Sequence, residues 1–452
     1  TIRVTVDTEF FFGGPVSAAE VSWTALSDGH RFEYTGPGRY SFFDYNRDEF
    51  EGPVVPGYGE VIAEGTGVTD ADGQFVIELP ADLGDSPTSR RFTLEAVVTD
   101  VNARSVAGRT EVVVHKSEFY VGVRPDVYIG IAGDEQAASL IVVDWDSKPA
   151  PGRNVVVEVV ERRWHSVREE DEYGRMQWTW SVEELPVGDP ILVTTDDNGL
   201  ATVSFTPPRG GVYKIKATVA DDAGNEVSAS TFMWVSGEEF ISWRQANNNR
   251  IELVADKDRY RPGDMAEVLI TSPFQGEDVQ ALISIERGSI LSYEVITLPS
   301  NSFVYEVPIT GGLAPNVYVS VVLIKGADDT NPVPAFRMGL VELEIDTVEQ
   351  EIQLIVTPDR EEVGPREDVT YTVEATDYQG DPVDAEVSLA LVDLATLSLA
   401  LPNSGPIVSH FYGNQGLGVR TAVPLSFSVD VLNQELFDRG KGGGGGGAEG
   451  FF

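Results

Sequence analysis

Short runs of β-branched and aromatic residues, interrupted by turn residues, constrain this chain more than any other feature. Val, Ile, Thr, Tyr and Phe favour strands because their side chains pack well on a pleated surface. The Gly, Pro, Asp and Asn between the runs favour turns. No long stretch has the 3.6-residue apolar spacing of a helix. The pattern predicts an all-β sandwich or barrel. The runs are Ile2–Val6, Phe75–Leu79, Phe92–Val98, Glu111–Val114, Leu140–Val143, Val155–Val160, Val203–Phe205, Val317–Ile324, Val369–Val373 and Val387–Leu391.

Pieces of the sequence recur at long range. Thr69–Ile77 matches Thr195–Val203, and Phe92–Asp100 matches Tyr213–Asp221. A spacing above 100 residues is too long for a solenoid and indicates tandem copies of one domain. We predict four closely set antiparallel β-sandwich domains followed by a flexible segment, and a long loop at Asp28–Glu60 inside the first domain. The predicted ranges are 1–116, 117–236, 237–347, 348–430 and, for the Gly-rich flexible segment, 431–452.

The charge and cysteine content exclude several classes of function. A net charge of −41 disfavours nucleic acid and anionic membrane surfaces, which both attract Lys and Arg. The chain has no Cys, so it has no disulfide and no thiolate chemistry. No apolar run reaches the ~20 residues of a membrane span. The start is a strand rather than a signal peptide, and both ends are interpreted as cut from a longer chain. An extracellular or periplasmic location stays open.

The candidate chemical motifs favour structural roles. The four histidines have no metal-ligand spacing and predict no zinc site. Asp70–Gly73 and Asp196–Gly199 resemble calcium loops faintly, but each lies where a tight hairpin turn is predicted and lacks the later Glu of an EF-hand. Arg162–Trp164 and Met176–Trp180 flank an acidic tip and predict a long hairpin. No nucleophile elbow or phosphate loop is present, so we predict no enzyme, no catalytic residue and no cofactor. The histidines are His30, His115, His165 and His410.

A glycine tract, Gly440–Gly450, follows these predicted domains. Glycine loses the most backbone entropy on ordering and has no side chain to bury, so such a tract is a flexible coil. Two interpretations are open. The tract is either an idle linker or a segment kept accessible so that another protein can grip it.

A series of short pieces, in a fixed order, resembles a known family. The pieces are Phe119–Val123, Val142–Asp146, Val157–Trp164, Thr195–Gly199, Asp258–Asp264, Ser272–Phe274, Ile283–Gly288, Ala385–Ala395, His410–Gly413 and Gly418–Thr421. Each piece is weak alone, but the ordered set covers nearly the whole chain. In this set the chain resembles the bacterial branch of the alpha-2-macroglobulin family. The resemblance implies consecutive macroglobulin-type β-sandwich domains that lead into a bait region.

The resemblance also implies a function, which is broad protease inhibition by entrapment. A protease cuts the exposed bait, and the cut releases a change of shape that encloses or tethers it. Target proteases, the neighbouring domains and a thioester domain are the implied partners. Because this chain has no Cys, a thioester would lie elsewhere in the full protein. The residues that proteases could read near the tract are Leu436, Phe437, Arg439, Lys441, Phe451 and Phe452.

Two rival functions remain. The first is a structural cell-surface stalk or adhesin of tandem β-sandwiches, in which the glycine tract is a spacer. The second, which the lack of a catalytic signature disfavours, is a carbohydrate-active enzyme with accessory sandwiches. The stalk predicts that cleavage at the tract changes neither shape nor binding, whereas the inhibitor predicts a change of shape.

Overall fold

The structure is a computed structural model of the 452-residue chain. Strands dominate the part that it describes, and nearly all of their pairs are antiparallel, so the predicted all-β fold class is confirmed. The division into four domains stays a prediction. The described residues are 1–11, 13–45, 59–84, 86–170, 176–244, 249–275, 278–329, 334–364, 367–392 and 407–421.

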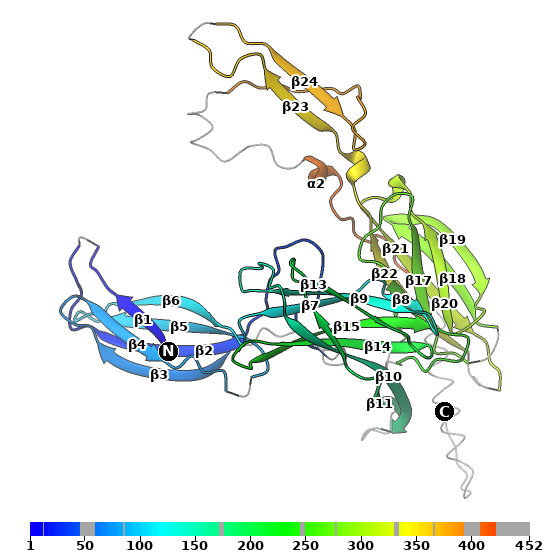
Figure 1. Ribbon diagram of the computed structural model, residues 1–452, viewed down its shortest axis with the longest axis horizontal. Coiled ribbons are helices and arrows are strands. Elements are labelled where there is room, and N and C mark those ends of the chain that lie inside the picture. Colours follow the sequence, from blue (N-terminus) through cyan, green and yellow to red (C-terminus); the bar gives the residue numbers. More distant parts are fainter. Residues whose placement is uncertain are drawn as a thin grey trace, which may run out of the picture.

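The first sandwich packs a two-stranded sheet, β1-β4, against a four-stranded sheet with the order β3-β2-β5-β6 (Figure 1). Ile77 and Leu79 of β4 meet Ala25, Phe92 and Leu94 of the larger sheet in a buried core. Alternate side chains of each strand point into this core, as the period of two requires. The strands are β1 (Ile2–Asp7), β2 (Glu20–Gly29), β3 (Glu60–Val68), β4 (Gln74–Leu79), β5 (Arg90–Thr99) and β6 (Ser105–Val114).

The second sandwich packs the sheet β13-β9-β7 against the sheet β11-β10-β14-β15-β8, where β12 also pairs with β10. Val123 and Leu140 of the smaller sheet meet Val157, Tyr213 and Met233 of the larger one. β10 and β11 form the predicted long hairpin. The strands are β7 (Tyr120–Pro125), β8 (Ile129–Ile131), β9 (Gln136–Val143), β10 (Asn154–Glu170), β11 (Met176–Pro186), β12 (Ile191–Thr194), β13 (Leu200–Phe205), β14 (Gly211–Ala220) and β15 (Glu226–Ser236).

The third sandwich packs β16-β17-β20 against β19-β18-β21-β22 and encloses its own buried core. Its larger sheet has the same strand order as the four-stranded sheet of the first sandwich. The strands are β16 (Leu253–Ala255), β17 (Met265–Thr271), β18 (Gln280–Arg287), β19 (Ser289–Thr297), β20 (Ser302–Pro308), β21 (Asn316–Lys325) and β22 (Ala335–Glu344), with the 3-10 turn η2 (Gly311–Leu313) before β21 and η3 (Val348–Gln350) after β22.

The turns predicted at Asp70–Gly73 and Asp196–Gly199 are present. The Asp70 carboxylate accepts hydrogen bonds from the backbone N–H groups of Asp72 and Gln74, at 2.9 and 2.8 Å. Gly73 has a φ of +76°, which glycine adopts without strain. The prediction that these turns close hairpins was wrong. The first turn joins β3 to β4, which belong to facing sheets, so the chain crosses the core there.

Residues 30–45 form a strap that leaves the first sandwich and crosses the second. Phe32 stacks on Tyr120 with ring centroids 4.1 Å apart, and Ser41 exchanges two 2.9 Å backbone hydrogen bonds with Val123 of β7. Asp44 pairs with Lys214 of β14 at 2.7 Å. The prediction that Asp28–Glu60 is a loop inside the first domain was therefore wrong for these residues. Their aromatic side chains bury against the outer face of β7 and β9.

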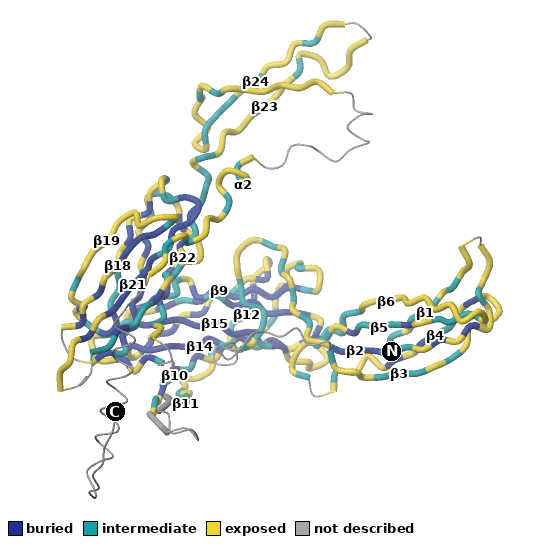
Figure 2. Tube along the Cα trace, turned by 180° about the vertical axis from the view of Figure 1, so that it is seen from behind, coloured by how far each residue is buried: buried dark blue, intermediate teal, exposed yellow. Residues whose placement is uncertain are grey.

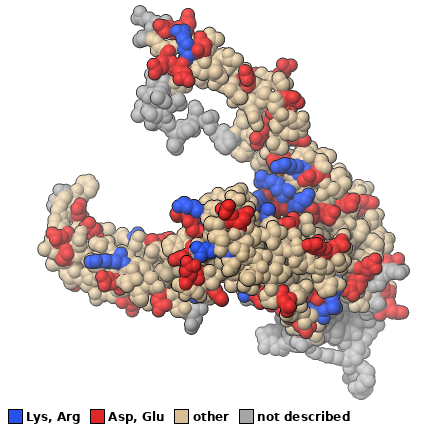
Figure 3. Space-filling view, in the orientation of Figure 1, with Lys and Arg blue, Asp and Glu red and all other residues tan. Residues whose placement is uncertain are grey.

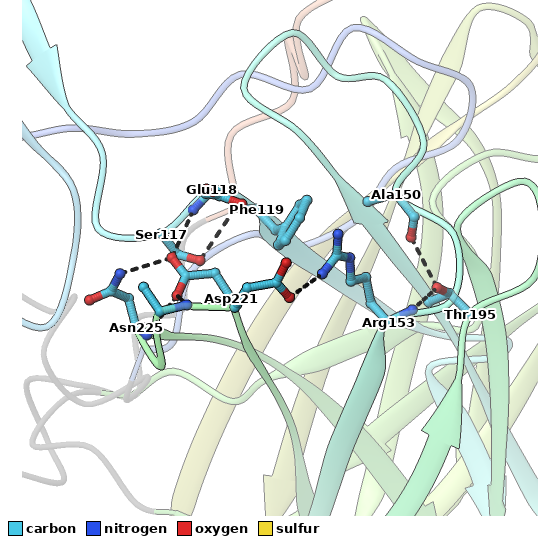
Figure 4. A network of polar contacts seen from close by, with 10 residues as sticks. Ser117, Glu118, Phe119, Ala150, Arg153, Thr195, Asp221 and Asn225 are labelled. Atoms are coloured by element: carbon cyan, nitrogen blue, oxygen red, sulfur yellow. Dashed lines mark hydrogen bonds and ion pairs between the residues drawn. The ribbon is translucent and has the colours of Figure 1, made fainter.

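A polar network fixes the chain where it enters the second sandwich (Figure 4). The Asp221 carboxylate accepts hydrogen bonds from the Glu118 backbone N–H at 3.3 Å and from the Asn225 side chain at 2.9 Å. Burial alone would raise the pKa of Asp221, but these hydrogen bonds hold it below its ordinary value. Nearby, Arg153 pairs with Asp222 at 3.0 Å. The network therefore fastens the start of β7 to the turn between β14 and β15.

The second and third sandwiches share a buried apolar interface. Phe232 and Trp234 of β15 pack with Leu269 of β17, and Trp243 of the connecting segment is buried among them. The indole N–H of Trp243 donates to the Asn301 carbonyl at 2.8 Å. These two sandwiches therefore pack as closely as the short connections predicted.

The chain then extends away from the third sandwich as an antiparallel pair, β23 (Gln353–Pro358) and β24 (Tyr371–Thr376). Most of their side chains are exposed (Figure 2). The strand predicted at Val387–Leu391 is wrong. Within the described residues, no strand pairs with residues 387–391, and the preceding sheet ends at β24. No second sheet faces β23 and β24 there, so no core forms that residues 387–391 could join.

Candidate functional site: the anchored segment at 412–419

The residues predicted to be read by proteases lie outside the described residues. They are Leu436, Phe437, Arg439, Lys441, Phe451 and Phe452. The structure shows how the chain is held upstream of them, at residues 412–419. A short helix, α2 (Ile407–Phe411), ends in a turn in which the Tyr412 N–H donates to the Val408 carbonyl at 2.7 Å. Residues 412–419 then lie against the third sandwich (Figure 1). We call this stretch the anchored segment.

The side chain of Asn316, at the start of β21, holds the anchored segment through its backbone. Asn316 Nδ2 donates to the Gln415 carbonyl at 2.9 Å, and the Gln415 N–H donates to Asn316 Oδ1 at 2.9 Å. The amide thus pairs with the segment as a neighbouring strand would. Asn316 is fully buried and also donates to Glu342 Oε1 at 2.9 Å. A buried amide with these partners is costly to remove because its partners lose their hydrogen bonds.

Two glycines form a second contact, where the anchored segment crosses the turn between β18 and β19. The Gly288 N–H donates to the Leu417 carbonyl at 2.9 Å. Gly418 has a φ of +66°, and a Cβ atom placed on it would lie 2.7 Å from the Gly288 Cα atom. Gly418 therefore needs to be glycine both for its backbone conformation and for the close approach. Because this contact joins backbone groups, it holds the segment in position and does not depend on which side chains lie beside it.

The acidic side chain of Glu342 contacts the anchored segment. Asn414 Nδ2 donates to Glu342 Oε1 at 2.5 Å, and the Tyr318 hydroxyl donates to the Gln415 carbonyl at 3.2 Å. Burial and the charge of Glu342 raise the pKa of Tyr318, so the phenol stays protonated as a donor. Acidic side chains are scattered over the face in Figure 3, with a gathering of Lys and Arg on the third sandwich below β23 and β24.

The ion pairs near the end of β22 join distant parts of the chain. Arg39 of the strap and Arg259 both pair with Glu344, Arg39 at 3.0 Å. Burial alone would raise the pKa of Glu344, but the hydrogen bonds from these two arginines hold it below its ordinary value. Glu344 therefore stays ionised and links the strap to the strand that leads toward β23.

The histidines occupy three separate places. His30 and His115 lie at the junction of the first two sandwiches, where His115 stacks on Trp145 with centroids 4.4 Å apart. His165 pairs with Glu183 on the β10–β11 hairpin, and His410 belongs to α2. Burial lowers the pKa values of both His30 and His115. Within the described residues, no group of three or more His, Cys, Asp or Glu side chains could hold a metal ion.

The contacts at the site attach one segment of the chain to the third sandwich. Backbone groups of 415, 417 and 418 meet Asn316 and Gly288, and no nucleophile with an adjacent base is found among them. Sequence reasoning identified Gly418 only as part of a family-like piece, and it missed Asn316 and Gly288. The one signal for Gly288 was its place at the end of the Ile283–Gly288 piece.

Comparisons relate the chain to known proteins. Residues 251–399 match the family model described as the alpha-2-macroglobulin bait region domain, which ends before Leu436. The chain is 22% identical over 428 residues to an alpha-2-macroglobulin homolog from Nostoc, covering 93% of this chain and 22% of that protein. It is 28% identical over 260 residues to an alpha-2-macroglobulin from Ralstonia nicotianae, covering 55% of this chain and 15% of that protein.

A solved structure gives a third comparison. The native conformation of E. coli alpha-2-macroglobulin is matched over 96% of this chain and 28% of that chain, at 14% identity and a TM-score of 0.38. The chain thus spans about a quarter or less of the length of the curated relatives named above.

Proposed function

We propose that this chain, whose residues 251–399 match the alpha-2-macroglobulin bait region domain, is part of a broad-spectrum protease inhibitor of the alpha-2-macroglobulin family. In this proposal a protease cuts an exposed bait segment, and the cut releases a change of shape that traps the protease. The chain itself catalyses no reaction. Strain stored in a held segment and released by cleavage is a known type of switch.

The observation that carries the proposal is the anchored segment itself. A strained or held segment can signal its own cleavage only if one end is fixed to the folded body. Asn316 and Gly288 fix the chain at Gln415 and Leu417, and the predicted bait begins shortly afterwards. In this proposal the anchored segment attaches the chain to the third sandwich upstream of the bait, which begins at residue 431.

The proposed cleavage residues suit several protease classes. Arg439 and Lys441 are the side chains that trypsin-like enzymes read, while Leu436, Phe437 and Phe451 suit enzymes that prefer large apolar residues. In this proposal the glycines between 440 and 450, which carry no side chain to pack, leave the backbone accessible to a protease.

The proposed partners are target proteases, neighbouring macroglobulin-type domains and a thioester domain of the longer protein. Because the chain has no Cys, it cannot form a thioester by itself. We propose an extracellular or periplasmic location. Among the described residues, no helix has the length and apolar character needed to cross a membrane.

Small-angle scattering before and after limited proteolysis of the full-length protein tests the proposal. We expect cleavage in residues 431–452 to change the scattering profile, and the double variant Arg439→Gln, Lys441→Gln to resist both cleavage by trypsin and the change. An unchanged profile after complete cleavage would contradict the proposal. That result would favour the alternative function, a stalk or adhesin of tandem sandwiches.

A further inference from the structure

The first sandwich joins the second end to end (Figure 1). Two connections cross this junction, one where β2 continues into the strap and one between β6 and β7. Among the described strands, none of the first sandwich packs broadly on a strand of the second, whereas β15 packs on β20 at the next interface. The orientation of the first sandwich therefore depends on a small number of side chains at the junction.

One of these side chains is His115, which links the two sandwiches. Its ring stacks on Trp145, whose indole N–H donates to the Ser117 carbonyl at 2.8 Å. His115 Nδ1 lies 2.9 Å from the Tyr120 hydroxyl, which donates to Ser89 Oγ at 2.8 Å. His115 and Ser89 flank strands of the first sandwich, while Tyr120 and Trp145 belong to the second. The imidazole is therefore part of the contact that holds the two bodies together.

His30 lies beside His115 at the same junction, with the two ring centroids 5.8 Å apart. Its backbone N–H donates to the Ser89 carbonyl at 3.0 Å. Its Nδ1 atom is buried and has no hydrogen-bond partner in the part of the chain that the structure describes. An imidazolium donates from both ring nitrogens, so a protonated His30 would bury a charged N–H without an acceptor. Such a group is costly to bury, and opening the junction to water removes the cost.

The charges around His30 act in the same direction. Burial lowers the pKa of His30 most, Arg91 of β5 lowers it further, and Glu33 of the strap raises it. Arg91 itself lies 3.7 Å from Glu111 of β6, and both of those side chains are about half exposed. No carboxylate is hydrogen-bonded to the His30 ring among the described residues. A proton on His30 therefore meets more opposition than support in the closed junction.

The groups around His115 are uncharged apart from His30. Burial and the charge of His30 lower the pKa of His115. Burial raises the pKa of Tyr120, so its hydroxyl stays protonated. The ring face of Trp145 would attract a charged His115, as aromatic faces attract cations. The cost of protonating the pair therefore falls mainly on His30, which has no such contact.

We propose that the junction between the first two sandwiches is a hinge that protonation of the His30–His115 pair opens. At neutral pH both rings are uncharged, and their contacts hold the sandwiches in one orientation. The closed form has the lowered pKa values, so it binds fewer protons than an open form in which the rings meet water. The closed form is fully favoured above the ordinary value of 6.5 and loses this advantage as the pH falls through the lowered values. The first sandwich then turns about its two connections.

Energy transfer between two dyes tests the hinge. Because the chain has no Cys, Asp72→Cys and Asp197→Cys give one labelling site on an exposed turn of each sandwich. Transfer efficiency should shift reversibly between about pH 7.5 and about pH 5. The ratio of open to closed molecules should rise up to tenfold for each unit by which the closed form lowers the pKa of His30. His30→Gln should remove most of the shift. His165→Gln, on the exposed β10–β11 hairpin, is the matched control and should respond as the labelled parent does.

Nuclear magnetic resonance of the four histidines in the unlabelled chain supplies an independent measurement. We expect the His30 ring to titrate below 6.5, and a midpoint at or above that value would overturn the proposal. Transfer efficiency that does not change with pH would overturn it too, as would an equal shift in a His30→Gln variant that is folded at neutral pH. Loss of the β-sheet circular dichroism over the same pH range would mean unfolding instead of a hinge. None of these results depends on the proposed protease inhibition.

Discussion

The interface between the second and third sandwiches and the β23–β24 pair represent opposite extremes of packing. At the interface, Phe232, Trp234 and Leu269 are buried against each other. On the β23–β24 pair, Leu354, Ile355 and Val356 are all about half exposed, at 51%, 58% and 49%. Buried apolar area is the main source of stability, so the first region should behave as one rigid body. The second region is attached to that body mainly through η3 and the anchored segment.

The difference between the two regions indicates how cleavage would change the shape of the molecule. The second and third sandwiches form a rigid body. The weakly packed part of the chain, which includes β23 and β24, is followed by residues 412–419, which contact that body again. The anchored segment is held by a few hydrogen bonds and one close glycine contact rather than by a core. It is therefore the part of the described chain that small changes should release first.

The largest effect is expected from Trp243→Ala. This side chain is 4% exposed and also donates a hydrogen bond to the Asn301 carbonyl. Truncation should lower the free energy of unfolding of the paired sandwiches by about 3–5 kcal/mol, as for other buried Trp residues. Urea unfolding followed by fluorescence measures the change. Phe240→Ala, at a half-exposed position, should cost under ~1 kcal/mol, and an equal loss in the two variants would contradict a core-like interface.

Asn316→Ala tests the anchored segment directly. It removes both hydrogen bonds to the Gln415 backbone and leaves Glu342 without this donor. We expect the segment to be destabilised by about 2 kcal/mol, with faster tryptic cleavage after Arg420. Tyr318→Phe removes a single 3.2 Å hydrogen bond and should show a smaller increase in the cleavage rate. Cleavage after Arg420 at the same rate in all three proteins would mean that Asn316 does not hold the segment.

Gly418→Ala tests the close approach to Gly288. A methyl group at a φ of +66° is strained, and it would lie 2.7 Å from the Gly288 Cα atom. The cost should be about 1–2 kcal/mol, measured as faster amide exchange in 412–419. Gly416→Ala is the matched control, because a Cβ atom there meets nothing within 4 Å. Equal exchange rates in the two variants would remove the glycine contact from the account.

The smallest effect is expected at the strap, through the pH dependence of stability. Burial opposes the ionisation of Asp44, but hydrogen bonds from Lys214 and Ser230 and the charge of Lys214 hold its pKa below the ordinary 3.8. A depressed folded pKa means that the carboxylate stabilises the fold above pH 3.8 and that this contribution is lost as the pH falls through the folded value. Unfolding midpoints measured against pH should show this loss, and Asp44→Asn should lack it.

The sequence predicted local structure well and long-range packing poorly. Gly73 and Gly199 were recognised as turn residues because positive φ is a local demand, and both adopt it. Which sheet each flanking strand joins is not local, so the hairpin prediction failed there. Val387–Leu391 has the composition of a strand, but a strand also needs a partner, and none pairs with it in the described chain.

In the candidate site, too, local features could be predicted from the sequence and long-range contacts could not. The piece Gly418–Thr421 could be singled out from the sequence, and the glycine tract pointed to an accessible segment. Asn316 could not be found, because a lone Asn at the start of a strand carries no local signal, and its partner Gln415 lies 99 positions away. The strap was missed for the same reason. Phe32, Tyr34, Tyr40 and Phe42 are spaced by even numbers, as residues on one face of an extended chain are, but the prediction of a loop did not use this signal.

The mass of the first fragments released by trypsin tests the central claim most directly. If the anchored segment leads into an exposed bait, the first cuts should fall after Arg439 or Lys441. The fragment that carries the three sandwiches should then stay whole. First cuts within residues 1–347, before any cleavage in 431–452, would contradict the account.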